Sequence, residues 1–179
     1  MSKKEKPTFA TVWLSGCSGC HMSLLDVDEA LVDIAEKVQF VYSPLMDIKE
    51  FPEQVKITLV EGAVANEEQL SMLNKVRART KSLVALGDCA VNGNVTALRN
   101  AETDVDEVLK RAYVETADMN PSNPRKVPRL LKRVYPLHEK VAVDFYVPGC
   151  PPSADSIFYV LTELLAGRTP QIEGKSKFG

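Results

Sequence analysis

The sequence at residues 8–21 reads TFATVWLSGCSGCH, and this stretch decides the fold. Residues 8–14 are apolar and β-branched enough for a buried strand. The run stops in glycines and two cysteines, Cys17 and Cys20, and apolar residues then recur at helical spacing. The cysteines are therefore expected on a loop between a strand and a helix. In open α/β sheets, such loops at the carboxyl ends of strands bind ligands.

The other two cysteines occur in the same local context. Cys89 follows a strand-like run that begins at Ser82, and Cys150 follows one that begins at Val143. A glycine precedes each cysteine by one or two residues, and a segment compatible with a helix follows each. If the three strands lie parallel, all four thiols converge at one edge of one sheet.

Length and composition limit the classes of protein to which this chain can belong. The chain has 179 residues and is predicted to be a single domain over 1–179, with flexible ends at about 1–7 and 168–179. Its formal net charge of -2 predicts no global attraction to nucleic acid or to anionic lipid. No apolar run approaches the roughly 20 residues of a membrane span, so no membrane association is expected. The start of the chain resembles neither a secretory nor a twin-arginine signal.

These observations predict a cytoplasmic protein. Thiols are kept reduced in the cytoplasm, so four cysteines there are better explained as metal ligands or redox groups than as a disulfide framework.

Hydrophobic patterning predicts a doubly wound parallel α/β sheet. Strands are expected at 8–14, 38–42, 56–60, 82–86 and 142–147, and helices at about 22–37, at 67–79 and between Ser153 and Gly167. Asn66 is a suitable N-cap for the second helix, with Gln69 placed for a capping box, and Ser153 can cap the last one. The alternation of strands and helices is typical of a parallel sheet covered on both faces.

The pattern is weaker between residues 94 and 136. A short helix is expected at 94–99 and an amphipathic helix at 104–114, whereas the prolines of 116–136 predict an excursion with at most short helical pieces. The segment 125–133 is basic, and we interpret it either as a solvated loop or as a docking surface for a partner or an anionic cofactor. Its five cations are Arg125, Lys126, Arg129, Lys132 and Arg133.

Four convergent thiolates are the ligand set of a cubane iron–sulfur cluster, [4Fe-4S], whose cysteines can come from distant parts of a chain. Cys17 and Cys20 would then bind two irons from one loop, while Cys89 and Cys150 would bind one each. Nearby glycines would let backbone N–H groups point at the cluster sulfurs. A zinc-stabilised interaction module with four cysteine ligands is an alternative, although structural zinc sites usually present two close Cys-x-x-Cys pairs and this chain has one.

Other uses of the cysteines stay open. Residues 17–21 also match the C-x-x-C-H pattern of covalent haem attachment, but this pattern expects an exported protein and leaves Cys89 and Cys150 without a role. A thioredoxin-like dithiol leaves the same two cysteines idle. Unligated core cysteines are the plainest alternative.

Three further residues lie near the cysteine loop in this interpretation. His21 is expected to be the first helical residue rather than a metal ligand. Trp13 is expected to pack under the loop. Glu61, at the end of the strand 56–60, is either an ordinary exposed carboxylate or a group beside the site that takes part in proton or conformational coupling.

Separated motifs in this chain resemble the small subunit of nickel–iron hydrogenases. They are W-L-x-x-C-x-G-C at 13–20 with S-L-L at 23–25, V-E-G at 60–62, G-x-C at 87–89 with Gly93, and P-G-C-P-P at 148–152. The resemblance implies a flavodoxin-like fold and a proximal [4Fe-4S] cluster on Cys17, Cys20, Cys89 and Cys150. It also implies that this cluster faces the nickel–iron centre of a separate large subunit, across a partly apolar interface beside residues 17–21 and Glu61. No catalytic residue is expected in this chain itself.

Departures from the family pattern narrow the resemblance. The chain lacks a cysteine-rich C-terminal extension, so it is similar to the short cytoplasmic type, particularly the small subunit of bidirectional, NAD(P)-linked soluble hydrogenases. This similarity implies an electron relay with one cluster, whose electrons leave into an iron–sulfur and flavin diaphorase that reduces NAD.

Two alternatives remain within the resemblance. The quinone-end cluster subunit of respiratory complex I is related, but it usually has adjacent cysteines where this chain has Cys17-x-x-Cys20. An FMN on this subunit is conceivable for soluble hydrogenases, although the sequence shows no phosphate-binding loop.

Overall fold

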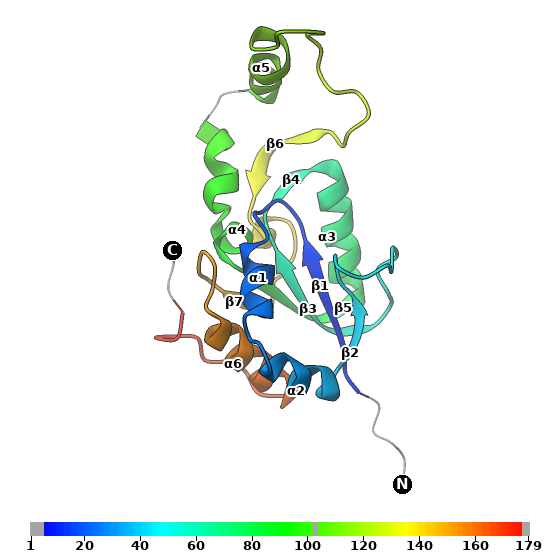
Figure 1. Ribbon diagram of the computed structural model, residues 1–179, viewed down its shortest axis with the longest axis vertical. Coiled ribbons are helices and arrows are strands. Elements are labelled where there is room, and N and C mark those ends of the chain that lie inside the picture. Colours follow the sequence, from blue (N-terminus) through cyan, green and yellow to red (C-terminus); the bar gives the residue numbers. More distant parts are fainter. Residues whose placement is uncertain (1–5, 102–103, 177–179) are drawn as a thin grey trace.

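A parallel five-stranded sheet in the order β2-β1-β3-β5-β7 forms the centre of the computed structural model (Figure 1). The structure describes residues 6–101 and 104–176. The strands are β1 (Thr8–Trp13), β2 (Gln39–Tyr42), β3 (Val55–Glu61), β5 (Thr80–Leu86) and β7 (Phe145–Val147). This is the strand order of flavodoxin-like proteins, so the predicted fold class is confirmed.

Helices cover both faces of the sheet, because the strands are apolar on both sides. Ile57 of β3 and Val84 of β5 pack with α1, α2 and α6, whereas Val60 and Ala85 of the same strands pack with α3 on the opposite face. The helical segments are α1 (Gly19–Leu25), α2 (Ala30–Lys37), α3 (Glu67–Arg79), α4 (Asp88–Asn92), α5 (Val105–Lys110) and α6 (Ala154–Leu165), with the 3-10 helices η1 (Asn94–Ala101) and η3 (Leu137–Glu139) and the π-helix η2 (Arg111–Glu115).

The start of α3 follows the predicted capping, with one difference. The Asn66 side chain accepts a hydrogen bond from the Gln69 N–H at 2.8 Å. The Gln69 side chain does not return to Asn66. It accepts instead from the Ala65 N–H at 2.9 Å and from the Ser15 hydroxyl at 3.0 Å. The capping box is therefore half formed, and its second half ties α3 to the loop after β1.

The predicted helix at 22–37 is wrong as a single element. The structure has two helices, α1 and α2, which run in different directions (Figure 1). Asp28 between them has a φ of 54°, a left-handed conformation that aspartate tolerates better than most residues. The break lets Leu24 of α1 and Ile34 of α2 both enter the core on the same face of the sheet.

The prediction that residues 116–136 form only short helical pieces is also wrong. Residues Leu130–Tyr135 form a strand, β6, which pairs antiparallel with β4 (Val64–Asn66) in a separate two-stranded sheet. Hydrophobic patterning does not predict this β4–β6 ribbon, the two-stranded sheet, because β4 has only three residues and Val134 is the sole fully buried residue of β6. The short helix expected at 94–99 is the 3-10 helix η1, and the helix expected at 104–114 is α5 continued by η2.

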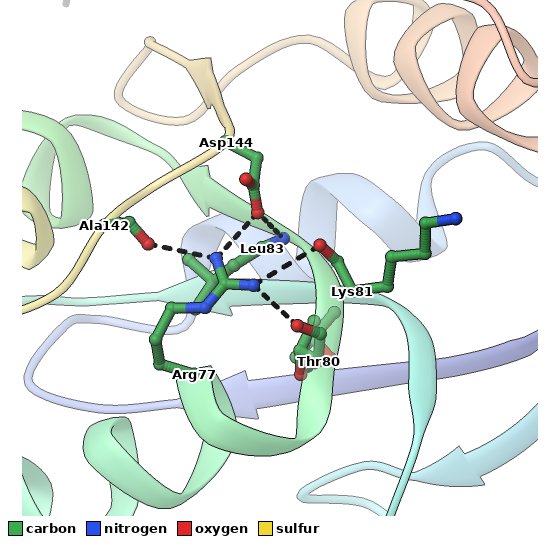
Figure 2. Close-up of polar contacts among 7 residues, drawn as sticks. Arg77, Thr80, Lys81, Leu83, Ala142 and Asp144 are labelled. Atoms are coloured by element: carbon green, nitrogen blue, oxygen red, sulfur yellow. Dashed lines mark hydrogen bonds and ion pairs between the residues drawn. The ribbon is translucent and has the colours of Figure 1, made fainter.

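At the amino end of the sheet, Arg77 of α3 fastens three segments together (Figure 2). Its guanidinium donates to the carbonyl oxygens of Thr80 at 2.5 Å and of Ala142 at 3.0 Å. It also pairs with Asp144 at 2.7 Å, and that carboxylate accepts the Leu83 N–H at 2.7 Å. One side chain thus joins α3, the start of β5 and the segment that leads into β7.

The segment after α6 folds back against that helix. Lys175 lies 4.3 Å from the centre of the Tyr159 ring, and its carbonyl accepts from the Ser156 hydroxyl at 2.5 Å. Of the flexible ends predicted at about 1–7 and 168–179, residues 1–5 and 177–179 lie outside the described residues. In the part of the chain that is described, no helix has the length and apolarity that a membrane crossing requires.

Candidate functional site

The four cysteines follow three parallel strands of the main sheet. Cys17 and Cys150 lie on loops, but Cys20, which was expected on a loop, lies in the first turn of α1, and Cys89 lies in the first turn of α4. Cys17 and Cys20 come after β1, Cys89 comes after β5, and Cys150 comes after β7. Cys17 and Cys150 are exposed, Cys20 and Cys89 are buried, and all four are free thiols. The loops lie at the carboxyl ends of the strands, where ligands bind in folds of this class.

Hydrogen bonds join the three loops into one rim. The Asp88 N–H donates to the Gly149 carbonyl at 2.9 Å, and the Gly149 N–H donates back to the Asp88 carboxylate at 2.6 Å. The Ser23 hydroxyl, on the helix after Cys20, donates to the Pro152 carbonyl. The loop of Cys150 is thereby fixed to both other cysteine loops.

The thiols share one electrostatic environment. Burial raises the pKa of the Cys20 thiol, and the charges of Glu61 and of the other three cysteines raise it further. Burial also raises the pKa of Cys89, with smaller contributions from Cys150, Cys17 and Glu61. Without a cation the buried pair therefore stays protonated at neutral pH. A cationic metal group bound to these sulfurs would reverse this balance.

Space next to the buried thiol depends on a glycine. Gly87 has a φ of 81°, and a Cβ added there would lie 2.2 Å from the sulfur of Cys20. Only glycine satisfies both conditions, because it has no Cβ and tolerates the backbone conformation. Gly87 therefore lets the end of β5 approach the Cys20 sulfur.

N–H groups also point at the exposed sulfurs. The Asn94 side-chain amide donates to the Cys150 sulfur at 3.3 Å, and the Gly19 backbone N–H donates to the Cys17 sulfur at 3.4 Å. Such donors stabilise negative charge on sulfur and tune the potential of a bound metal group. Sequence analysis missed Asn94, which lies five residues after Cys89 in a segment expected to be a plain helix.

Glu61 and His21 form a buried pair behind the cysteine loop. Glu61 is 1% exposed, so its interpretation as an ordinary exposed carboxylate is wrong. Its carboxylate accepts the His21 backbone N–H at 2.9 Å and also contacts the His21 Nδ1 atom. His21 is the third residue of α1 rather than the first, because the helix begins at Gly19. The pair fixes the start of α1, directly beside Cys20, to the end of β3.

The outer surface beside the exposed cysteines is apolar. Trp13, Met22 and Leu25 are 46%, 56% and 42% exposed. Trp13 was expected to pack under the loop, but its ring lies at the surface, with its centroid 6.4 Å from that of the His21 ring. These three exposed apolar side chains, which lie on β1 and α1 on either side of Cys17 and Cys20 in the chain, are named here the apolar face.

The donor set of the rim consists of thiols, the ligands of iron–sulfur clusters. Among the residues that the structure describes, no three His, Cys, Asp or Glu side chains gather closely enough to hold a single metal ion. The four thiols nevertheless influence one another electrostatically. Four free thiols on a shared rim, with N–H donors aimed at two of them, match the ligand chemistry of an iron–sulfur cluster.

Fold and rim together define a flavodoxin-like α/β protein with a four-cysteine site at the carboxyl end of its sheet. Residues 17–164 match the model of the family described as NADH ubiquinone oxidoreductase, 20 Kd subunit. The chain belongs to this family. The matched residues contain all four cysteines.

Curated proteins that match this chain include several hydrogenase subunits. The chain is 42% identical to the NAD-reducing hydrogenase HoxS subunit delta of Cupriavidus necator, over 93% of this chain and 82% of the relative. It is 41% identical to a subunit of the F420-non-reducing hydrogenase of Methanothermobacter marburgensis, over 91% of this chain but 54% of that relative. The chain thus spans about half the length of this archaeal relative. The predicted resemblance to hydrogenase small subunits is confirmed.

Solved structures agree with this assignment. A crystal structure of an NAD+-reducing [NiFe]-hydrogenase in the H2-reduced state contains a chain that superposes with a TM-score of 0.91 at 40% identity, covering 98% of this chain and 100% of the other. A [NiFeSe]-hydrogenase from Dm. baculatum superposes with a TM-score of 0.59 at 18% identity over 92% of this chain and 62% of the other, which shows a shared fold only.

Proposed function

We propose that this chain is the electron-relay subunit of an NAD-reducing nickel–iron hydrogenase and that Cys17, Cys20, Cys89 and Cys150 hold its one [4Fe-4S] cluster. The observation that carries the proposal is the rim itself: four free thiols on three segments that follow parallel strands and that hydrogen bonds join together. The identity of 42% to an NAD-reducing hydrogenase subunit over nearly the whole chain supports the same function.

When bound, such a cluster accepts and passes on one electron at a time. The protein's contribution is to position the cluster and to tune its potential. Cys20 and Cys89 would hold the group through buried sulfurs, while the Asn94 and Gly19 N–H groups would stabilise negative charge on the sulfurs of the two exposed cysteines. Glu61 holds the Cys20 segment in place through His21.

The proposed partners are a large subunit that holds the nickel–iron centre and a diaphorase that reduces NAD. The large subunit would cover the apolar face of Trp13, Met22 and Leu25, because this face adjoins the exposed thiols. Glu61 lies behind the rim and not in this interface, since it is buried in the chain itself. The proposed place of action is the cytoplasm.

An FMN at the same end of the sheet fits poorly. In flavodoxin-like folds the flavin phosphate binds at the loop after the first strand. Here the buried Glu61 carboxylate lies directly behind that loop and already accepts the His21 N–H, so it would repel a phosphate. The proposed cofactor is therefore the cluster alone.

Iron and acid-labile sulfide counts on anaerobically purified protein test the proposal. We expect about four of each per chain, with broad brown absorbance. Replacing any one of the four cysteines with serine should lower the iron count and stop hydrogen-driven NAD reduction, with circular dichroism unchanged. A colourless chain with bound zinc would instead identify the zinc-stabilised interaction module.

A hydrogen-consumption assay distinguishes the proposed hydrogenase subunit from a complex-I-like subunit, which belongs to a related group. A complex-I-like subunit would co-purify with quinone-reducing subunits and show no hydrogen-driven NAD reduction. A haem absorption band in the purified protein would contradict both assignments.

A further inference from the structure

Residues 104–129, named here the arm, project from the end of the molecule that also carries the cysteine loops (Figure 1). The arm contains α5 and η2, and neither helix has a buried residue. Every side chain of the arm is exposed or only partly covered. Short helices are marginal in water unless packing supports them, so this arm lacks the support that ordinary helices receive from a core.

The base of the arm, in contrast, is firmly held. Arg99 donates to the carbonyl oxygens of Leu131 and Ala65, both at 3.0 Å. Asn100 exchanges two hydrogen bonds with the backbone of Val134, at 2.7 and 2.8 Å. These contacts hold the chain before the arm and the strand after it to the body of the protein.

A groove of about 610 Å³ runs between α5 and the extended segment that leads into β6. One wall carries Val105, Leu109 and Tyr113, and the other carries Pro124 and Val127. Tyr113 is 46% exposed and Val127 is 59% exposed. This surface is concave and partly apolar, as expected for a protein-binding site.

The groove itself carries both signs of charge, because Glu67 and Asp106 line it together with Arg125 and Arg129, whereas the adjoining chain segment is basic. The segment 125–133 has five cations and no carboxylate. Within the described residues none of these five cations forms an ion pair, whereas Lys110 and Arg111 on the helical side both pair with Glu115. The chain as a whole has a net charge of -2, so this basic segment is a local feature.

We propose that the arm is a docking element for an acidic face of a partner subunit, with the cations of 125–133 as its electrostatic anchor and the groove as its apolar seat. The inference deepens the proposed function, on which it rests for the existence of partner subunits. Charge complementarity selects the occupant, because unpaired cations at a partly apolar groove favour carboxylates accompanied by apolar side chains. A polyanion such as RNA would need a wider basic surface than one such segment.

Zero-length carbodiimide cross-linking of the intact, unaltered complex tests this proposal directly. The reagent joins a lysine only to a carboxylate in direct contact. We expect mass spectrometry to find Lys126 or Lys132 joined to Asp or Glu residues of a co-purifying subunit. Lys49, an exposed lysine on the connection between β2 and β3, provides the matched control and should form no such link. The absence of intersubunit links from both Lys126 and Lys132, or equal links from Lys49, would overturn the proposal.

Charge reversal provides a second test. The double variant Arg125→Glu with Arg129→Glu should weaken binding to the partner by about tenfold or more at moderate salt, and the difference should shrink as salt is raised. Lys49→Glu should leave binding unchanged. Iron content is measured on the same samples. A chain without iron would refute the proposed cluster, while unchanged partner binding by the double variant, or its rescue by added RNA, would refute the docking role.

Discussion

The two ends of the central sheet are built for different purposes. At the amino end, Arg77 occupies carbonyl groups and a carboxylate from three segments, so polar groups there are satisfied within the chain (Figure 2). At the carboxyl end, thiols are left free, two of them exposed, beside an uncovered apolar face. The comparison teaches that one edge of a sheet can be closed by hydrogen bonds within the chain while the opposite edge keeps free groups available to a ligand.

Gly87→Ala should produce the largest effect, and it should be confined to the carboxyl end. Its Cβ would lie 2.2 Å from the Cys20 sulfur, so we expect near-complete loss of bound iron. Gly167→Ala is the matched control, because Gly167 also has a positive φ, 74°, but nothing lies within 4 Å of its added Cβ. The control should cost about 1 kcal/mol of backbone strain and keep its iron. Equal iron loss in both variants would contradict the steric argument.

Glu61→Ala should destabilise the fold itself, although Glu61 lies at the carboxyl end. The variant leaves the buried His21 N–H groups without their acceptor, which should lower the free energy of unfolding by about 2–3 kcal/mol. Glu61→Gln keeps an acceptor oxygen and should lose less. Denaturant unfolding of each variant measures the difference, with the exposed Glu36→Ala as a control close to wild type. A Gln variant as unstable as the Ala variant would show that charge, not hydrogen bonding, matters there.

Arg77→Met tests the amino end. The loss of its hydrogen bonds and of the pair with Asp144 should lower the free energy of unfolding by about 1–2 kcal/mol. Iron content per folded chain should stay unchanged, because the clamp lies at the opposite edge. Lys75→Met removes only an exposed pair with Glu50 and should cost less than about 0.5 kcal/mol. Iron loss in the Arg77 variant would show that the two edges are coupled.

Alkylation of the metal-free protein should reveal a smaller effect, a difference in reactivity between the exposed and the buried cysteines at the carboxyl end of the sheet. Iodoacetamide attacks the thiolate, so a raised pKa and burial both slow the reaction. Cys17 and Cys150 are exposed and should react first, whereas Cys20 and Cys89 are buried with raised pKa values and should react later. Peptide mapping over time records the order. Simultaneous labelling of all four would indicate that the metal-free rim opens.

The sheet could be predicted from the sequence because its strands are apolar runs placed between helical patterns. The β4–β6 ribbon could not, because three residues of β4 pair with a strand that buries only Val134. The division of α1 from α2 depends on the left-handed Asp28, which periodicity does not record. The two wrong predictions have the same cause, because tertiary packing rather than local sequence determines these elements.

The candidate site also contains residues that could be predicted from the sequence and residues that could not. The cysteines could be placed on strand-end loops because each follows an apolar run, while their role as cluster ligands stays a prediction. The Glu61–His21 pair was missed because its members are 40 residues apart. A signal was nevertheless present: Glu61 ends a strand that is buried on both faces, where an unpartnered carboxylate would be costly.

The exposure of Cys17 and Cys150 also bears on biogenesis. If the four thiols hold the proposed cluster, a protein that delivers it would reach the rim from the side on which these two thiols are exposed. The apolar face of Trp13, Met22 and Leu25 adjoins that side, so a large subunit seated there would close the route. The small subunit would then have to receive its cluster before it binds the large subunit.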